Sequence, residues 1–245
     1  MSEFHWVFGI HAVEALLQRQ PASIESLYFQ LGRQDERMAR LQQLAAEANI
    51  NCRQLPRDEL DEMVQDRHQG VVARTRGGRT LREKDLEQLL ETLEHPPLLL
   101  ILDGVTDPHN LGACLRSADA AGVDAVIAPK DKSVGLNATV RKVACGAAEV
   151  IPFVQVTNLA RTLRDLQQRG VWLIGAAGEA EQSLYECDLK GPLALIMGAE
   201  GRGMRRLTRE HCDHLVKLPM AGSVSSLNVS VATGICLFEA VRQRA

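Results

Sequence analysis

Residues 98–122 read Leu-Leu-Leu-Ile-Leu-Asp-Gly-Val-Thr-Asp-Pro-His-Asn-Leu-Gly-Ala-Cys-Leu-Arg-Ser-Ala-Asp-Ala-Ala-Gly, and they decide the fold of the larger part of the chain. The apolar run Leu98–Leu102 has the length of a buried strand. Pro108 and Asn110 are typical of a turn and a helix start, and Gly112 permits close approach of another backbone. A buried strand followed directly by a helix is the repeating unit of a parallel α/β sheet.

The same strand–loop–helix pattern recurs on both sides of this stretch. Further strands are predicted at Ala125–Ala128, Ile151–Gln155, Val171–Gly175, Leu193–Met197 and Leu215–Leu218. Helices are predicted at Leu111–Ala121, Asn137–Gly146, Leu159–Arg169, shortly after Met204, and at Leu227–Arg244. This alternation predicts a mostly parallel sheet covered on both faces, with ligands bound at the carboxyl ends of its strands.

The residues before this sheet predict a smaller α/β unit, from Gly9 to Arg76, that alternates short helices and strands. A glycine- and arginine-rich segment follows it. From Arg74 to Lys84 the sequence contains five cationic residues and one acidic residue, which gives a local charge of +4. Two interpretations stay open for this segment. It is either a solvated hinge or a strap that contacts phosphates.

Composition excludes several classes of protein. The 245 residues carry a net charge of −3, and no apolar run approaches the roughly 18 residues that span a bilayer. The N-terminus shows no export signal, and the six cysteines form no CxxC pair, so we expect a cytoplasmic protein without a disulfide framework. His211, Cys212 and His214 lack a fourth ligand, so we expect no metal site.

A second motif, Ile196-Met-Gly-Ala-Glu-Gly-Arg-Gly-Met204, places three glycines at a strand-to-helix junction. Its GxxGxG spacing fits neither a Walker loop nor a GxGxxG dinucleotide fingerprint. The motif is either a tight turn or a loop whose main chain touches a cofactor. Glu200 at its apex is a charge that a plain turn does not require.

A third motif runs from Leu218 to Glu239, where a polar loop leads into a strongly apolar helix. We expect Ser226 to cap this helix and Asn228 to lie in its first turn. The hydrophobic stretch 231–238 predicts burial in the core or against another subunit. In the first motif, Arg116 lies six residues after Asn110, and its role is either an ion pair with a nearby aspartate or a contact in the same loop region.

In order and spacing, the three motifs resemble those of the SpoU (TrmH-like) RNA ribose methyltransferases of the SPOUT superfamily. Phe8-Gly-Ile-His-Ala-Val13 and His68-Gln-Gly-Val-Val-Ala73 resemble the edges of the RNA-binding domain in the branch that methylates guanosine in bacterial 23S rRNA. Phe8 departs from the pattern, because relatives often carry tyrosine there. The resemblance covers almost the whole chain.

The resemblance implies a SPOUT-type parallel sheet with a C-terminal trefoil knot, preceded by a small α/β, ribosomal-protein-like RNA-binding domain. It implies residues 1–76 as the RNA-binding domain, 77–84 as a basic flexible linker, and 85–245 as the methyltransferase domain. It also implies S-adenosylmethionine as cofactor and a homodimer formed through the catalytic domain. By the same resemblance, the cofactor contacts are Gly198, Leu218, Met220 and Leu227.

The implied activity is methyl transfer to the ribose 2′-hydroxyl of a guanosine in the peptidyl-transferase loop of 23S rRNA. The implied catalytic residue is Arg116, surrounded by Asn110, Glu200, Ser226 and Asn228. Our hypothesis is that Arg116 holds the target phosphate and stabilises charge on the 2′-oxygen, because guanidinium stays protonated. Glu200 would orient Arg116 or accept the proton through water. We expect RNA contacts at Arg74, Arg76 and Arg79.

The sequence supports three other functions less well. A tRNA ribose methyltransferase of the same family is disfavoured by the long N-terminal extension. A non-catalytic rRNA-binding assembly factor would have no use for Asn110, Arg116, Glu200 and Asn228 together. A generic nucleotide-dependent enzyme is disfavoured because no phosphate-binding fingerprint occurs in the sequence.

Overall fold

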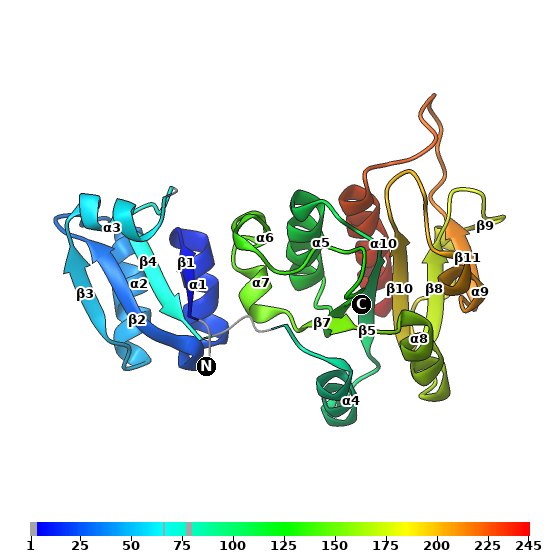
Figure 1. The fold of residues 1–245 in the computed structure, drawn as a ribbon, viewed down its shortest axis with the longest axis horizontal. Helices are drawn as coiled ribbons and strands as arrows, with labels where there is room; N and C mark the ends of the chain where they lie inside the picture. The colour runs from blue at the N-terminus through cyan, green and yellow to red at the C-terminus, as the bar shows by residue number, and fades with distance from the viewer. Residues whose placement is uncertain (1–3, 66, 77–79) are drawn as a thin grey trace. The chain divides into compact units, whose positions relative to one another are not determined.

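The computed structural model describes residues 4–65, 67–76 and 80–245, and it divides the chain into two compact units. The first unit comprises residues 1–79 together with 145–150, and the second comprises residues 80–144 and 151–245. Each unit has its own sheet (Figure 1). Among the helices of the described residues, none is long and apolar enough to cross a membrane.

The first unit is built on a four-stranded sheet of order β1-β4-β2-β3. Its strands are β1 (His5–Phe8), β2 (Ile24–Gln30), β3 (Cys52–Leu55) and β4 (Val71–Thr75). Strand β4 runs antiparallel to both β1 and β2, whereas β2 and β3 are parallel. Strand β1 was not expected from the sequence, and its pairing with β4 sets Trp6 beside Arg74.

Helices cover both faces of this smaller sheet. They are α1 (Ile10–Arg19), α2 (Glu36–Glu47) and α3 (Arg57–Met63), with the 3₁₀ turn η1 (Pro21–Ser23) and the short α7 (Ala147–Val150) completing the unit. Leu16 and Met38 bring α1 and α2 onto the face that carries Leu27. Leu60 of α3 packs on the opposite face, against Val72. This alternation of buried residues along the strands is what fixes the register.

The second unit contains a seven-stranded sheet of order β7-β6-β5-β10-β8-β11-β9, and all its strand pairs are parallel. The strands are β5 (Leu98–Asp103), β6 (Ala125–Pro129), β7 (Phe153–Val156), β8 (Trp172–Ala176), β9 (Gln182–Ser183), β10 (Leu193–Gly198) and β11 (His214–Lys217). All six residues of β5 are buried, which accounts for its uninterrupted apolar sequence. The predicted parallel α/β architecture is therefore confirmed.

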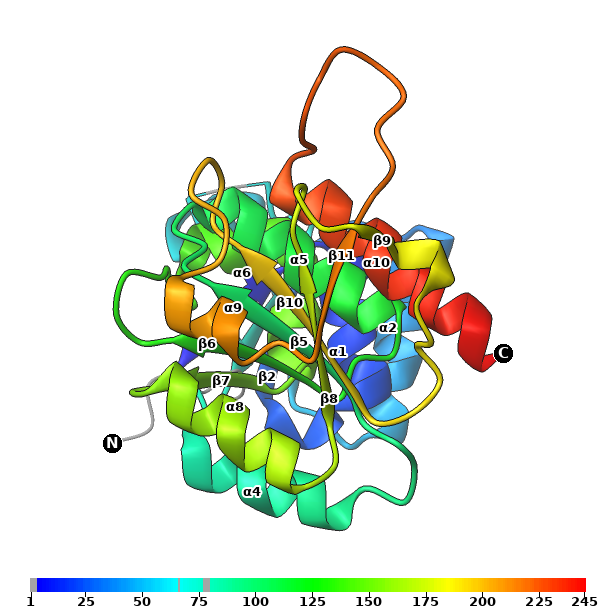
Figure 2. The ribbon, with the colours of Figure 1, turned by 90° about the vertical axis from the view of Figure 1, so that its right-hand side faces the viewer.

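Helices lie on both faces of the larger sheet, as Figure 2 shows. They are α4 (Glu83–Thr92), α5 (Pro108–Ala120), α6 (Ala138–Ala144), α8 (Leu159–Gln168), α9 (Arg206–Glu210) and α10 (Val229–Arg244), with the 3₁₀ turn η2 (Leu184–Glu186). Helices α4 and α8 pack on one face, through Leu86 and Leu163. On the other face, α10 packs against α5 and β10.

Residues 81–84, which the sequence analysis assigned to the linker 77–84, form ordered structure in the second unit. Leu81 bridges to Val154, and α4 begins at Glu83, which the sequence analysis did not predict. The Glu83 carboxylate accepts hydrogen bonds from the backbone N–H (2.6 Å) and the hydroxyl (2.7 Å) of Thr157. Residues 77–79 lie outside the described residues.

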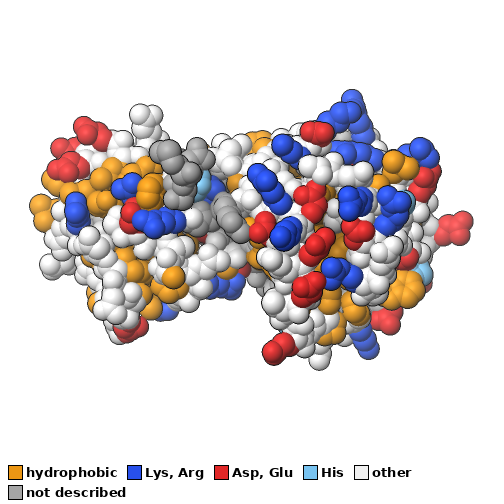
Figure 3. Space-filling model, turned by 60° about the horizontal axis from the view of Figure 1, so that its bottom comes forward, with side chains coloured by type: hydrophobic (Ala, Val, Ile, Leu, Met, Phe, Trp, Pro, Cys, Tyr) orange, Lys and Arg blue, Asp and Glu red, His pale blue; other side chains and the backbone are white. Residues whose placement is uncertain are grey.

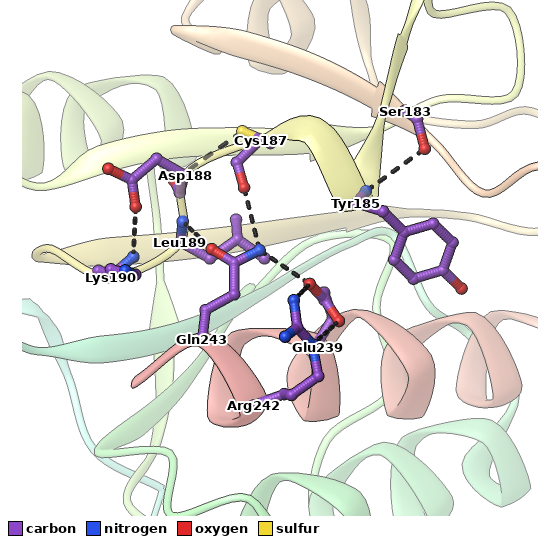
Figure 4. Close-up of polar contacts among 9 residues, drawn as sticks. All are labelled: Ser183, Tyr185, Cys187, Asp188, Leu189, Lys190, Glu239, Arg242 and Gln243. Atoms are coloured by element: carbon purple, nitrogen blue, oxygen red, sulfur yellow. Dashed lines mark hydrogen bonds and ion pairs between the residues drawn. The ribbon is translucent and has the colours of Figure 1, made fainter. Parts of the chain in front are cut away.

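The end of α10 is fastened to the segment 187–189 by a hydrogen-bonded cluster centred on Glu239 (Figure 4). Arg242 donates from Nε and Nη2 to the two oxygens of the Glu239 carboxylate, over 2.9 and 2.8 Å. Gln243 donates to Glu239 and to the carbonyl of Cys187, and it accepts from the N–H of Leu189. Hydrogen bonds from Arg242 and then Gln243 lower the pKa of Glu239 to about 2.

This lowered pKa predicts a pH dependence of stability. A carboxyl whose pKa is lower in the folded than in the unfolded chain stabilises the fold above its unfolded value, about 4.3, and loses this contribution as the pH falls towards 2. The variant Glu239→Gln should therefore be less stable than the wild type at pH 7, and the gap should narrow as the pH is lowered from about 5 to 3. Urea unfolding of both proteins across this range measures the gap; a gap that stays constant with pH would contradict the assignment.

Candidate functional site

Three loops at the carboxyl ends of β5, β10 and β11 carry the motifs singled out in the sequence. The first leads from β5 into α5, the second from β10 into α9, and the third from β11 into α10. Because the strands are parallel, all three loops emerge at the same edge of the sheet. This edge is the candidate functional site.

One carboxylate joins the three loops. Glu200 Oε1 accepts hydrogen bonds from Nδ2 of Asn110 (2.9 Å) and from Nδ2 of Asn228 (2.8 Å). The Asn228 amide also donates to Oδ1 of Asn110, over 2.9 Å. The three residues therefore form a closed triangle across 118 residues of sequence. Neither bond to Glu200 uses Oε2, which leaves that oxygen for a further partner.

The start of α10 differs from the sequence prediction. Asn228, and not Ser226, is the cap: its Oδ1 accepts from the N–H of Ser230 (2.9 Å) and from the Ser230 hydroxyl (2.6 Å), and the helix begins at Val229. Ser226 lies two residues earlier, in the exposed loop. Asn228 thus caps the helix through its oxygen and holds Glu200 through its nitrogen, a division that requires an amide side chain.

The glycine motif forms a turn that closes on itself. Ala199 and Gly203 exchange two backbone hydrogen bonds, of 2.9 and 3.1 Å, and Gly201 and Gly203 adopt positive φ angles of 74° and 66°. A Cβ at Gly198 would lie 2.3 Å from the backbone carbon of Gly203, so only glycine fits there. The turn therefore explains the GxxGxG spacing and holds Glu200 at its apex.

An ion pair between a buried carboxylate and an exposed arginine anchors this turn to the neighbouring strand. The Asp103 carboxylate, which ends β5 and is 1% exposed, accepts from the Arg205 N–H over 2.7 Å and lies 3.2 Å from Arg205 Nε. The same guanidinium donates to the carbonyl of Asp131 over 3.0 Å. Neither Asp103 nor Arg205 was expected at the site from the sequence. The only available signal was a carboxylate at the end of a wholly apolar strand.

A cavity of about 530 Å³ opens beside Glu200. It is lined by all four residues expected to contact the cofactor, Gly198, Leu218, Met220 and Leu227, and by Glu200, Ser226 and Asn228. Residues 176–179, the last residue of β8 and the three after it, form a further wall that the sequence did not predict. Its volume and its mixture of main chain, apolar side chains and a few polar groups are typical of small-molecule sites.

Arg116 lies six residues beyond Asn110 on α5, less than two turns, and is exposed. Six residues advance a helix by about 9 Å, so Arg116 stands further along the helix axis than the triangle. The Arg116 guanidinium takes part in none of the three hydrogen bonds of the triangle. The structure thus brings together Asn110, Glu200 and Asn228, and leaves Arg116 at an exposed position on the same helix.

The arginines expected to contact RNA belong to the first unit. Arg74 and Arg76 both form ion pairs with Glu25, over 3.1 and 3.2 Å. Their guanidinium carbons also lie 4.0 and 5.4 Å from the centre of the Phe4 ring. Arg79 lies outside the described residues. These two cations are therefore partly neutralised within the unit that carries them.

Cysteine chemistry is disfavoured near this site. Burial raises the pKa of Cys114, on α5, to about 11, and burial raises the pKa of Cys236, on α10, to about 12. Both thiols stay protonated at neutral pH and act as packing groups. Within the described part of the chain, no three histidine, cysteine or acidic side chains are placed to hold a metal ion.

Fold and site together define an α/β protein whose cofactor-sized cavity is walled by backbone turns at the carboxyl edge of a parallel sheet. Comparison with known families identifies it further. Residues 97–238 match the SpoU rRNA Methylase family, and residues 6–81 match the domain described as RNA 2'-O ribose methyltransferase substrate binding. The chain therefore belongs to the SpoU rRNA methylase family.

Relatives resemble the chain over its full length. The 23S rRNA (guanosine-2'-O-)-methyltransferase RlmB of Pseudomonas aeruginosa is 66% identical, with 100% of this chain and 98% of the relative covered. The protein of the same name from Escherichia coli is 59% identical, and both chains are covered completely. The SpoU methyltransferase AviRb of Streptomyces viridochromogenes, solved with the cofactor AdoMet, shares the fold with a TM-score of 0.78 at 23% identity, over 98% of this chain and 90% of AviRb.

The contact at Gly198 predicts a strong effect of a single methyl group. Gly198→Ala should lower the free energy of unfolding by about 2 kcal/mol or more, because the new Cβ overlaps backbone that cannot move without opening the turn. Gly191→Ala is the matched control, since a Cβ there meets nothing within 4 Å. Urea unfolding compares the two variants with the wild type, and equal stabilities of all three would refute the fitted turn.

Proposed function

We propose that this protein transfers a methyl group from S-adenosylmethionine to the ribose 2′-hydroxyl of a guanosine in 23S rRNA. Membership of the SpoU family and the names of relatives at 59–66% identity support this reaction and this substrate. The single structural observation that carries the proposal is the Asn110–Glu200–Asn228 triangle on the wall of the cavity. We place the modified guanosine in the peptidyl-transferase loop, as the family resemblance implies.

The cavity residues fit S-adenosylmethionine in size and chemistry. Leu218, Met220 and Leu227 offer apolar surface for adenine, and the backbone of the turn after Gly198 offers main-chain hydrogen-bonding groups. The carboxylate of Glu200 on the same wall matches a ligand with cationic groups. When bound, S-adenosylmethionine supplies a methyl group activated by its sulfonium centre.

The chain's own residues would act on the ribose. For the 2′-oxygen to accept the methyl group, the 2′-hydroxyl would have to lose its proton to a group of the chain. Glu200 is the proposed proton acceptor, directly or through water, because the two amides hold Oε1 and leave Oε2 open. Arg116 holds the phosphate beside the ribose and stabilises the developing negative charge. Ser226, which also lines the cavity, is the remaining member of the proposed group of catalytic residues.

The finer architecture is part of the proposal. We infer a trefoil knot in the second unit: β11 pairs with β8, whereas α10, which follows it, packs against β10 and α5. The segment 218–228 must therefore cross the carboxyl end of β10, where the turn 199–203 lies. A crystal structure whose segment 218–228 passes outside the turn would refute the knot. We further assign residues 1–76 to RNA binding of the ribosomal-protein-like kind, in the cytoplasm, with the linker reduced to residues 77–80.

The function is tested by mapping 2′-O-methyl positions in 23S rRNA, which resist alkaline cleavage, in cells with and without the gene. We expect one guanosine mark to disappear in the deletion strain and to return with the wild-type gene. Arg116→Ala should not restore it, although the purified variant should bind S-adenosylmethionine with near wild-type affinity. Arg116→Lys should restore little, since the two-pronged guanidinium contact is lost.

Two outcomes would count against this proposal. An unchanged methylation pattern in the deletion strain would remove 23S rRNA as the substrate; tRNA from the same strains, mapped in parallel, tests the other substrate class in the family. Full complementation by Arg116→Ala would leave the reaction standing but would remove Arg116 from it.

We also propose a homodimer that forms through the second unit. Helix α10 buries Thr233, Cys236 and Leu237 against its own chain, yet Val231 and Phe238, seven residues apart on one face, are 51% and 50% exposed. Exposed apolar residues that repeat along one helix face are typical of subunit contacts.

Light scattering should give twice the chain mass of 26.9 kDa for the wild type and a single mass for the double variant Val231→Glu, Phe238→Glu. The control is Trp172→Glu, which adds a charge at another exposed apolar residue of the same unit and should remain dimeric. A wild type that runs at a single mass would refute the dimer.

A further inference from the structure

Three cations at the carboxyl edge of the larger sheet differ from the other charges near them. Lys130 and Lys132 follow β6, and Arg202 stands in the turn 199–203, two residues after Glu200. All three are exposed, and none makes a side-chain hydrogen bond or ion pair with the residues that the structure describes. Arg206 and Arg209, a few residues further on, pair with Glu210 and Glu179.

The two segments that carry these cations are joined. Arg205 donates to the carbonyl of Asp131, which lies between the two lysines, and Asp103 holds the same guanidinium. A Cβ added to Gly104 would lie within 4 Å of both the Ala199 Cβ and the Lys132 carbonyl oxygen, so the two segments are close in space. The loop 130–132 and the turn 199–203 therefore form one continuous rim, which we call the cationic rim.

The rim stands on the carboxyl edge of the sheet, as does the triangle around Glu200. Any ribose that brings its 2′-oxygen to this edge also brings the adjoining 3′-phosphate and its neighbours. Exposed cations without partners are the groups that bind such phosphates, because they need not first break an ion pair. Asp131 reduces the net charge of the loop, but its carbonyl is held by Arg205 and both flanking lysines remain exposed.

We propose that Lys130, Lys132 and Arg202 bind the backbone phosphates of the substrate RNA on either side of the modified ribose. This inference rests on the proposed function and adds to it a binding surface on the second unit. The rim differs from Arg74 and Arg76, whose charges are shared with Glu25. It therefore assigns part of the salt-sensitive affinity for RNA to the catalytic unit itself.

The test compares two triple variants that change the formal charge equally. The rim variant is Lys130→Gln, Lys132→Gln, Arg202→Gln. The control variant is Arg161→Gln, Arg164→Gln, Lys190→Gln, three exposed cations of the same unit that lie outside the rim. The first two of these lie on α8. Figure 3 shows basic and acidic side chains interleaved over the second unit on the face it presents.

Binding of each protein to an unmodified 23S rRNA transcript is measured from 50 to 200 mM salt. With about 0.7 counterions released per phosphate contact on a single strand, the rim variant should lose about 2 from the slope of log affinity against log salt. Raising the salt from 50 to 200 mM lowers both affinities. The factor by which the wild-type affinity falls should be about 16 times larger than the factor for the rim variant. The KM for RNA should rise, and the affinity for S-adenosylmethionine should stay unchanged. The control should keep the wild-type slope.

A charge-retaining variant, Lys130→Arg, Lys132→Arg, Arg202→Lys, should also keep the wild-type slope. A rim variant with the wild-type slope and KM would overturn the proposal, as would one that lowers kcat alone. Equal losses in the rim and control variants would overturn it too, because they would reduce the effect to net charge. If the wild type binds the transcript but transfers no methyl group to it, the proposed function fails and the phosphate-binding rim stands.

Discussion

The site depends on three hydrogen bonds between two amides and one carboxylate. Asn110, Glu200 and Asn228 come from loops that follow three different strands, and each bond closes a long stretch of chain. Bonds to a charged acceptor are roughly twice as strong as neutral ones, and the carboxylate is the acceptor of two of them. Because both amides converge on a single oxygen, the position of one loop fixes the other two. The functional edge is therefore a single constrained unit.

The loops reach these positions because of close packing and an ion pair at the ends of the strands that carry them. Glu200 is held at the apex of its turn because Gly198 lets the backbone of the turn approach to a distance that no Cβ would allow. The Asp103–Arg205 pair then fastens the end of the turn to the neighbouring strand, and Asp103 is too deeply buried to be satisfied by water. A rigid parallel sheet supplies the frame, and the polar groups at its edge lock the loops onto that frame.

Sequence patterns predicted the fold more completely than they predicted the site. Apolar runs such as Leu98–Leu102 predict buried parallel strands because every residue of such a strand is covered. The family resemblance grouped Asn110, Glu200 and Asn228 with Arg116 and Ser226. It did not give the bonds among them, since those depend on how three loops meet in space. The cap was misplaced at Ser226 because serine and asparagine are almost equally good caps. The sequence did not reveal Asp103, Arg205 or the wall 176–179, because nothing local distinguishes an ion pair between distant residues or a wall made of backbone.

Charge is where counting along the sequence misleads most. The segment from Arg74 to Lys84 carries a formal +4, yet Arg74 and Arg76 share Glu25, a residue about fifty positions earlier. Near the cavity, the sequence shows only scattered cations in a chain of net charge −3. In the folded chain, Arg205 and Arg206 form ion pairs with acidic side chains. Lys130, Lys132 and Arg202 form none with the described residues. The charge available to a polyanion is what remains after internal pairing, and that remainder is a property of the fold.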